Sequence, residues 1–433
     1  MKQTPEVTIK LNSRLLPLTM GLLLVLQFTI PHESWLILLI GLGGMWLISH
    51  RWARSLGRSL SLTRQMRYGW AQVGDRLEEQ FILTNTGWAV GLWVEVVDHS
   101  TLPGQQRSQV SGVSGQGLSR WKTQRLCSQR GVFTLGPTTL RSSDPFSLYT
   151  VILRHPDSVT LTVTPPIVPL PTIEVAPGGR AGEGRPRATA LERTVNAATV
   201  RNYVPGDDLR AIHWPTSARR GNFYVRRFEN TPAGDWWIIL DLEAGVQAGS
   251  GPDSTEEHAV ILAASLADRG LRAGRAVGLL AHGQSLIWLP PQPGDTQRLK
   301  ILRALATAGP GPQPLAHLLA DPAFGRWASL IIITPSTSGA WVEALLPLVR
   351  HQATATVLLL DPTAFGGHGD HQAIAGLLGD FGISHHPITP DLLDRPTLQP
   401  GRQGRWQWRV SPLGRAISAQ KPQDMRWKSL EEQ

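Results

Sequence analysis

The stretch Trp236-Trp237-Ile238-Ile239-Leu240-Asp241 decides the fold of the second half of this chain. An apolar run of this length that ends in a carboxylate is typical of a strand buried on both faces of a sheet. Similar runs follow, and amphipathic stretches separate them, which predicts a mostly parallel, doubly wound α/β domain over residues 236–398. Strands are expected at 236–240, 276–280, 329–334 and 356–360, and helices at 254–269, 296–308, 340–350 and 371–380.

The residues before this domain have a different pattern. Short runs of β-branched and aromatic residues, separated by turn residues, predict a small β-sandwich over 61–165. Strands are expected near 77–85, 91–97 and 130–137, and a Gly/Ser/Gln-rich loop at 103–119. Residues 166–200 are rich in Pro, Gly, Ala and Arg and are typical of a linker. The whole chain is therefore expected to be an α+β multidomain protein.

The N-terminus carries two apolar runs, 15–30 and 35–48, on either side of Pro31-His-Glu-Ser34. With their flanks, 11–30 and 31–50, both reach the roughly 20 residues that a membrane-spanning helix needs. Trp35, Trp46 and Trp52 lie near the ends of these runs, where interfacial rings belong. We therefore expect a transmembrane helical hairpin within residues 1–60. A cleaved signal peptide and a buried soluble hairpin are the alternatives.

The net charge of +9 is concentrated at the two ends of the chain. Residues 1–70 carry +6, residues 400–433 carry +4, and the middle carries −1. A nucleic-acid-binding domain needs a basic face on a folded body, so no nucleic acid is expected as a partner. Basic residues flank both ends of the hairpin, and its turn has none, which predicts cytoplasmic termini at the cell membrane. The basic, Trp-rich tail, 399–433, is expected to lie on the anionic leaflet or to be disordered.

No motif of a known catalytic site occurs in the chain, so we expect it not to be an enzyme. A Gly-x-x-x-x-Gly-Lys-Ser/Thr loop and a Gly-x-Ser-x-Gly elbow are both missing from the sequence. The single cysteine, Cys127, excludes an internal disulfide and is interpreted as a packing residue. His368, Asp370, His371, His385 and His386 are interpreted as surface loop residues.

Residues 201–235 combine a turn, mixed charges and aromatic rings. The segment Arg201-Asn-Tyr203-Val-Pro-Gly-Asp207-Asp208 runs on through Trp214 to Ser217-Ala-Arg219. It resembles the signature of a bacterial family, domain of unknown function family fifty-eight, although Pro215 stands where that family has a basic residue. Asp144-Pro-Phe-Ser147-Leu also resembles a family pattern, with Ser147 in place of the usual Gly.

This resemblance implies a membrane-anchored protein with a von Willebrand factor A-like domain. It also implies a partner, a MoxR-type AAA ATPase, and hence the role of a scaffold or adaptor. The candidate contacts with this partner are Arg201, Tyr203, Asp207, Asp208, Trp214 and Arg219. The alternative interpretation is an ion-pair network that joins the linker to the next strand, because structural networks of this kind imitate functional sites.

A metal site is the second functional candidate. Von Willebrand A domains that bind Mg²⁺ carry Asp-x-Ser-x-Ser after the first strand, whereas this chain has Asp241, Glu243 and Gly245. Pro335 also stands where a further Asp would be expected. Hard cations need several oxygen ligands, so we expect no bound cofactor. The alternative function is that of a metal-dependent receptor or enzyme that uses Asp241 and Glu243 with Mg²⁺.

Overall fold

The computed structural model describes residues 5–66, 69–104, 108–170, 173–176, 199–204, 212–227, 235–320, 328–351, 353–392, 407–410, 416–420 and 428–429. The chain divides into unit 1, Met1–Pro166 with Arg395–Gln433, and unit 2, Ile167–Asp394. Both units contain sheets, and the fold is mixed α+β, as expected.

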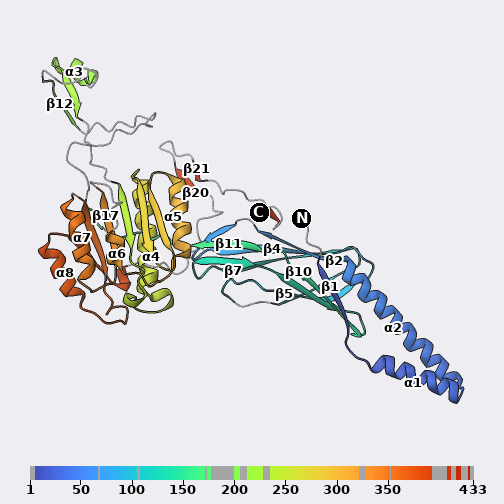
Figure 1. The fold of residues 1–433 in the computed structure, drawn as a ribbon. Helices are drawn as coiled ribbons and strands as arrows, with labels where there is room; N and C mark the ends of the chain where they lie inside the picture. The colour runs from blue at the N-terminus through green and yellow to red at the C-terminus, as the bar shows by residue number, and fades with distance from the viewer. Residues whose placement is uncertain are drawn as a thin grey trace. The chain divides into compact units, whose positions relative to one another are not determined.

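Most described strands of unit 1 lie in three sheets, and their pairing is mostly antiparallel (Figure 1). The five-stranded sheet has the order β1 (Glu6–Leu11), β10 (Tyr149–His155), β9 (Thr138–Ser143), β5 (Gly91–Asp98) and β6 (Gln109–Val113). The four-stranded sheet has the order β22 (Lys428–Ser429), β2 (Leu60–Met66), β4 (Arg76–Asn85) and β7 (Leu118–Leu126). The three-stranded sheet has the order β3 (Trp70–Gln72), β11 (Val159–Thr164) and β8 (Gly131–Leu135).

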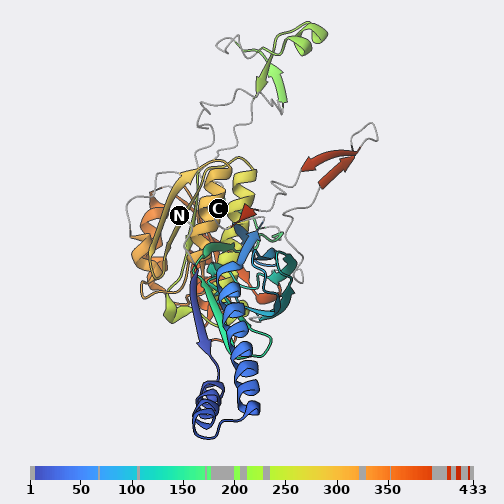
Figure 2. The ribbon, with the colours of Figure 1, turned by 90° about the vertical axis from the view of Figure 1, so that its right-hand side faces the viewer.

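The apolar N-terminal runs form two helices, α1 (Leu15–Thr29) and α2 (Glu33–Ser59), which pack side by side (Figure 2). Of the described helices, α2 is long and apolar enough to cross a membrane, and α1 is shorter. The expectation that residues 11–30 form one 20-residue helix is wrong at its start. Leu11 ends strand β1, because Glu6–Leu11 alternates polar and apolar side chains with the period of a strand.

The C-terminal part of α2 belongs to the core of unit 1. Ala53 and Leu56 are fully buried and share one core with strands of the five-stranded and four-stranded sheets, including Val151 and Leu83. Helix α2 ends at Ser59, and β2 begins at the next residue. The last turns of α2 therefore share a core with the β-sheets of unit 1.

The Gly/Ser/Gln-rich stretch 103–119 contains strand β6 and the start of β7, so the expectation of one continuous loop is wrong there. Pairing with β5 orders β6, although Gly112 lowers its intrinsic strand preference. Residues 105–107 lie outside the described part. The expected strands at 77–85, 91–97 and 130–137 are confirmed as β4, β5 and β8.

Unit 2 contains a six-stranded sheet in which five strands run parallel (Figure 1). Its order is β16 (Leu286–Gln292), β15 (Val277–His282), β14 (Trp236–Leu240), β17 (Ser329–Thr334), β18 (Thr354–Leu360) and β19 (Ser384–Ile388). The helices are α4 (Thr255–Arg272), α5 (Asp295–Thr307), α6 (Leu315–Leu319), α7 (Ala340–Arg350) and α8 (His371–Asp380), with 3-10 turns η2 (Ala244–Val246), η3 (Gly251–Asp253) and η4 (Pro390–Leu392).

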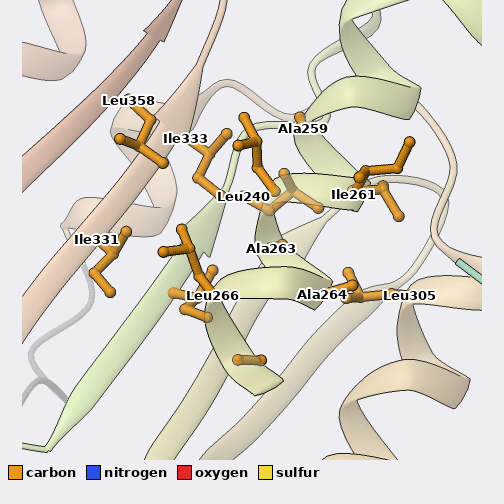
Figure 3. Close-up of a cluster of buried hydrophobic side chains, with 14 of the residues drawn as sticks. Leu240, Ala259, Ile261, Ala263, Ala264, Leu266, Leu305, Ile331, Ile333 and Leu358 are labelled. Atoms are coloured by element: carbon orange, nitrogen blue, oxygen red, sulfur yellow. The ribbon is translucent and has the colours of Figure 1, made fainter. Parts of the chain in front are cut away.

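Two cores cover the opposite faces of this sheet. Leu240 and Ile331 contribute to the core that contains α4 (Figure 3), whereas Ile239 and Ile332 contribute to the core that contains α7. Because consecutive strand residues point to opposite faces, β14 and β17 must be apolar throughout. The predicted parallel sheet is confirmed, and the predicted helices begin and end within three residues of those observed.

Three smaller pairings complete the described elements. Strands β20 (Gln407–Val410) and β21 (Ala416–Gln420) form an antiparallel pair, and β22 joins the edge of β2. These pieces lie in the tail that was expected on the leaflet or disordered. In the signature segment, β12 (Thr199–Asn202) pairs with β13 (Tyr224–Arg227), and α3 (Trp214–Arg220) lies between them in the sequence.

Candidate functional site

The signature segment folds as a small hairpin that carries a helix. The antiparallel register joins Arg201 of β12 to Val225 of β13, and an isolated bridge joins Ile212 to the same Val225. Ile212 and Val225 are both buried, so they supply the apolar contact that holds the two chain segments together. The segment is thus a folded element of its own rather than a featureless linker.

Local hydrogen bonds define both ends of α3. His213 Nδ1 accepts the backbone N–H of Thr216 over 3.3 Å, which satisfies one of the free donors at the start of a helix. Pro215 occupies the first turn of α3, where its missing N–H leaves no helical hydrogen bond unmade. At the other end, Gly221 adopts φ of 74°, the left-handed conformation that terminates helices. The departure from the family pattern at Pro215 therefore suits the helix.

One face of this element exposes aromatic side chains. Trp214 is 63% exposed and Phe223 is 56% exposed, and their ring centroids lie 6.2 Å apart in an edge-to-face arrangement. Tyr203 also meets Phe223 edge to face, with a centroid distance of 6.3 Å. A hollow of about 310 Å³ lies beside them, lined by Trp214, Ser217, Ala218, Gly221, Asn222 and Phe223. We call Tyr203, Trp214 and Phe223 the aromatic face.

The other signature candidates are only partly described. Asp207 and Asp208 lie outside the described residues, and for Arg201 the structure describes the strand but not the side chain. Arg219 is exposed, and among the described residues no ion pair involves it. The ion-pair network between Arg201, Asp207, Arg210 and Arg219 therefore stays a prediction. Tyr203 and Trp214 are the two candidates that the structure brings together, through Phe223.

Phe223 was not among the sequence candidates. A single aromatic residue between Asn222 and Tyr224 gives no periodic signal, and its exposure depends on the turn after α3. That turn is held by the Ser217 hydroxyl, which accepts the backbone N–H of Tyr224 over 2.9 Å. Arg220 lies over the Tyr224 ring at 5.5 Å, which adds a cation–π contact between α3 and β13.

The second candidate site lies at the carboxyl end of β14. Asp241 is fully buried, and its two carboxylate oxygens accept the Thr334 hydroxyl over 2.6 Å and the backbone N–H of Glu243 over 3.1 Å. Burial raises the pKa of Asp241 to about 6, although these two hydrogen bonds lower it. The Thr334 hydroxyl in turn accepts the backbone N–H of Ser336 over 2.9 Å. Asp241 therefore ties the loop after β14 to the loop after β17.

This arrangement does not resemble an open cation site. In the described part of the chain, no group of three His, Cys, Asp or Glu side chains is placed to hold a metal ion. The backbone carbonyls of Asp241 and Glu243 both accept the Gln247 amide over 3.2 Å, which closes the same loop. Asp241 and Glu243 lie two residues apart in the loop after β14. The observed contacts of Asp241 hold this loop in place by hydrogen bonds.

Sequence reasoning missed the pair formed by Asp361 and His371. Asp361 follows β18 at the same edge of the sheet, and His371 Nδ1 lies 3.1 Å from its carboxylate. Desolvation raises the pKa of Asp361. Hydrogen bonds from Thr363 and the charge of His371 lower the pKa by more than desolvation raises it, so the pKa falls below its usual value. His385 and His386 lie in strand β19, so their assignment to a loop is wrong. Cys127 is buried, and burial raises its pKa to about 11.

Comparison with known proteins places the signature segment and most of the sheet of unit 2 in one family. Residues 199–358 match the family described as protein of unknown function DUF58. The family expected from the residues is therefore confirmed for this part of the chain. The matched range begins at β12, so it includes the aromatic face and most of the α/β sheet, without β19.

The curated relatives are themselves described as uncharacterized. YeaD of Bacillus subtilis is 35% identical over 112 residues, which cover 26% of this chain and 26% of that protein. Rv1480 of Mycobacterium tuberculosis is 25% identical over 173 residues, 37% of this chain and 54% of that protein. The chain thus matches about a quarter to a half of these relatives. Among solved structures, a CARDB domain from Pyrococcus furiosus has 10% identity, covers 24% of this chain and 90% of its own, and has a TM-score of 0.18, too low for an inference.

Proposed function

We propose that this protein is a membrane-anchored scaffold or adaptor, and that the aromatic face of its signature segment is the surface that binds its partner. The observation that carries this proposal is the exposure of Trp214 and Phe223, the two rings that flank the hollow. Exposed aromatic clusters are enriched where proteins bind other proteins. Residues 199–227 also carry a net charge of +4, which favours an acidic partner surface.

The proposed anchor consists of α1 and α2. Leu22 and Phe28 of α1, and Ile37 and Ile40 of α2, are between 60% and 80% exposed in the chain. A soluble helical hairpin would bury such side chains, whereas lipid tails cover them at no cost. Cleavage after the first apolar run would remove β1 from its pairing with β10, which argues against a signal peptide. Two spans with both termini in the cytoplasm remain our proposed topology.

The partner that the family resemblance suggests is a MoxR-type AAA ATPase, and we propose that unit 2 is a von Willebrand A-like domain. The mostly parallel sheet of unit 2 is compatible with that fold class. Asp241 occupies the position of the first metal ligand of such domains, but the Thr334 hydroxyl and the Glu243 N–H already bind its two oxygens. Partner binding is therefore proposed to proceed without a divalent metal.

The proposal is tested by measuring binding of a purified MoxR-type ATPase from the same cell to the full chain in lipid nanodiscs. Trp214→Ser and Phe223→Ser are expected to weaken binding at least tenfold, as for aromatic hot-spot residues worth about 1.4 kcal/mol or more. Phe381→Ser is the matched control, because Phe381 is 48% exposed in the same unit but does not belong to the signature segment. Equal binding by all three variants would contradict the proposed surface.

The metal-dependent alternative is tested in the same assay by adding a chelator. Asp241 is too buried to reach a partner directly, so a metal effect would require the loop after β14 to open. We expect chelator to leave the affinity unchanged. Loss of binding in chelator, restored by Mg²⁺, would favour the metal-dependent receptor and count against the adaptor mechanism proposed here.

A further inference from the structure

Helix α2 meets the β-sheets at one end of unit 1 (Figure 1). Several large apolar side chains of the strand ends and loops at this end are exposed. Trp88 is 58% exposed, Leu92 is 56% exposed, Trp93 is 41% exposed and Phe146 is 53% exposed. Trp88 lies in the loop 86–90, Leu92 and Trp93 lie at the start of β5, and Phe146 lies in the loop 144–148. We call these four residues the aromatic rim.

The first loop is fixed against α2. The indole N–H of Trp52 donates to the backbone carbonyl of Val90 over 3.1 Å, and the rings of Trp52 and Trp88 meet edge to face at 5.2 Å. The Asn85 amide donates to the Ala89 carbonyl over 2.7 Å, which stiffens the loop from inside. Trp88 is therefore held at the level of Trp52 on the helix.

The second loop reaches the same level of α2. The Asp144 carboxylate accepts the backbone N–H of Phe146 over 3.0 Å and that of Tyr149 over 2.6 Å. The Tyr149 ring packs on the ring of His50 at a centroid distance of 5.4 Å. The Asp-Pro-Phe motif thus forms a hydrogen-bonded turn directly before Tyr149, and the Tyr149 ring contacts His50, two residues from Trp52 along the helix.

The length of α2 determines how far Trp52 lies from the start of the helix, and hence its expected depth in a bilayer. A helix rises about 1.5 Å per residue, so α2 reaches Trp52 about 30 Å after Glu33, which matches the hydrocarbon thickness of a bilayer. The apolar stretch ends at Ile48, and the exposed Arg51 follows. His50 and Trp52 are therefore expected at the boundary between hydrocarbon and headgroups.

The length of α1 is an independent reason to expect the turn at 144–148 near the bilayer. Its 15 residues span only about 22 Å, less than the hydrocarbon core. The helix starts three residues after Asn12, whose side chain donates to the Ser147 carbonyl over 2.8 Å and whose backbone N–H donates to the Leu148 carbonyl over 2.8 Å. A short helix tied so closely to this turn draws the turn toward the bilayer.

We propose that the aromatic rim lies in the headgroup layer of the bilayer and fixes unit 1 against the membrane surface. The inference rests on the proposed membrane anchoring by α1 and α2. Tryptophan is favoured at this depth, because its apolar ring is covered while its N–H stays near water. Phenylalanine and leucine add apolar contact with the acyl chains at the same boundary. The exposed Arg51 and Arg54 beside the rim would attract anionic headgroups. The Asp-Pro-Phe motif then acts as a membrane-facing turn.

The experiment is a nitroxide accessibility measurement on the full chain in vesicles of phosphatidylcholine and phosphatidylglycerol. The label is attached to a single introduced cysteine, in Leu92→Cys, Ile40→Cys or Val132→Cys. Cys127 is buried and its pKa is raised to about 11, so it stays unlabelled. Ile40 reports on the anchor, and Val132, 50% exposed in β8, reports on a part of unit 1 away from the rim.

We expect the Leu92 label to collide with oxygen several-fold more, relative to a water-soluble nickel complex, than the Val132 label does. The double variant Trp88→Ser, Phe146→Ser should shift the Leu92 label toward water, whereas Val110→Ser, at a site that is also well exposed, should not. A Leu92 label as accessible to nickel as Val132, with Ile40 in lipid, would overturn the rim proposal alone. An Ile40 label in water would overturn the anchoring as well.

Discussion

At the scale of single residues, Asp241 has the most unusual environment among the candidates. Its carboxylate is fully buried beside Thr334, and desolvation raises its pKa from 3.8 to about 6. The folded chain therefore holds this proton more tightly than the unfolded chain does. The contribution of Asp241 to stability is most favourable below about pH 4 and is lost as the pH rises through about 6.

Asp241→Asn is expected to remove this pH dependence. Between about pH 4 and pH 7, the free energy of unfolding of the wild type should fall by about 3 kcal/mol relative to that of the variant, because one pKa unit corresponds to about 1.36 kcal/mol. Urea titrations of the full chain in detergent at several pH values measure this difference. A constant difference across the range would mean that Asp241 has an ordinary pKa.

Ser147 is a second residue in an unusual conformation. Its φ of 54° lies in the left-handed region, which costs an L-residue about 1–2 kcal/mol and glycine much less. Ser147→Gly, which restores the residue usual in the family pattern, should raise the thermal midpoint of unit 1. Ser147→Val should lower it, because a branched side chain fits this conformation worst. Equal thermal midpoints for the two variants would contradict the interpretation that Ser147 is strained in this turn.

At the scale of elements, a buried ion cluster joins the strands of unit 1. Glu79 of β4 is fully buried, and it bonds Arg64 of β2 and Arg125 of β7. Asp98 at the end of β5 bonds the same two arginines. The cluster therefore connects the four-stranded sheet to the five-stranded sheet, and both arginines depend on both carboxylates.

Glu79→Gln should destabilise unit 1 by about 3 kcal/mol or more, because it leaves two arginines with one carboxylate in a buried place. Hydrogen exchange of the β4 amides, measured by mass spectrometry, reports this loss locally. Glu78→Gln is the matched control, since the Glu78 side chain is half-buried, points to the other face of β4 and pairs with Gln124. An equal loss of protection in both variants would contradict the special role of the cluster.

The elements that the sequence predicted well are those with a strong hydrophobic period. Strands β14 and β17 and helices α4 and α7 follow from continuous apolar runs and amphipathic spacing. Strand β16 was missed because Pro290 and Pro291 suggest a loop, although they are tolerated at the edge of a sheet. Strand β1 was missed because its alternation merges with the apolar run of α1.

The candidate site was predicted only in part for a similar reason. Tyr203 and Trp214 carry the family pattern and are visible in the sequence, but their contact depends on Phe223. The burial of Asp241 under Thr334 is also a tertiary effect, because the two residues lie 93 positions apart. No local sequence pattern encodes contacts at that separation. The replacement of the two serines of the metal-binding motif by Glu243 and Gly245 also does not indicate which groups bind Asp241 instead.

At the scale of the whole molecule, the proposed membrane anchor and the proposed partner-binding face belong to different units of the chain. The apolar helix α2 shares a core with the sheets of unit 1 through Ala53 and Leu56, so the proposed anchor is part of a folded domain. The family domain of unit 2 carries the aromatic face. A scaffold of this kind is expected to hold a soluble partner at the membrane, which determines where the partner works rather than what chemistry it performs.

The most direct test of this account is photo-crosslinking in the living cell. The full-length chain would carry a benzophenone amino acid at position 214 in one strain and at position 381 in a control strain. After irradiation, we expect the membrane fraction to contain an adduct with the MoxR-type ATPase for position 214 and none for position 381. Equal adducts at both positions, or no ATPase adduct at 214 while the protein is at its normal level in the membrane, would contradict the claim that the signature segment binds the partner.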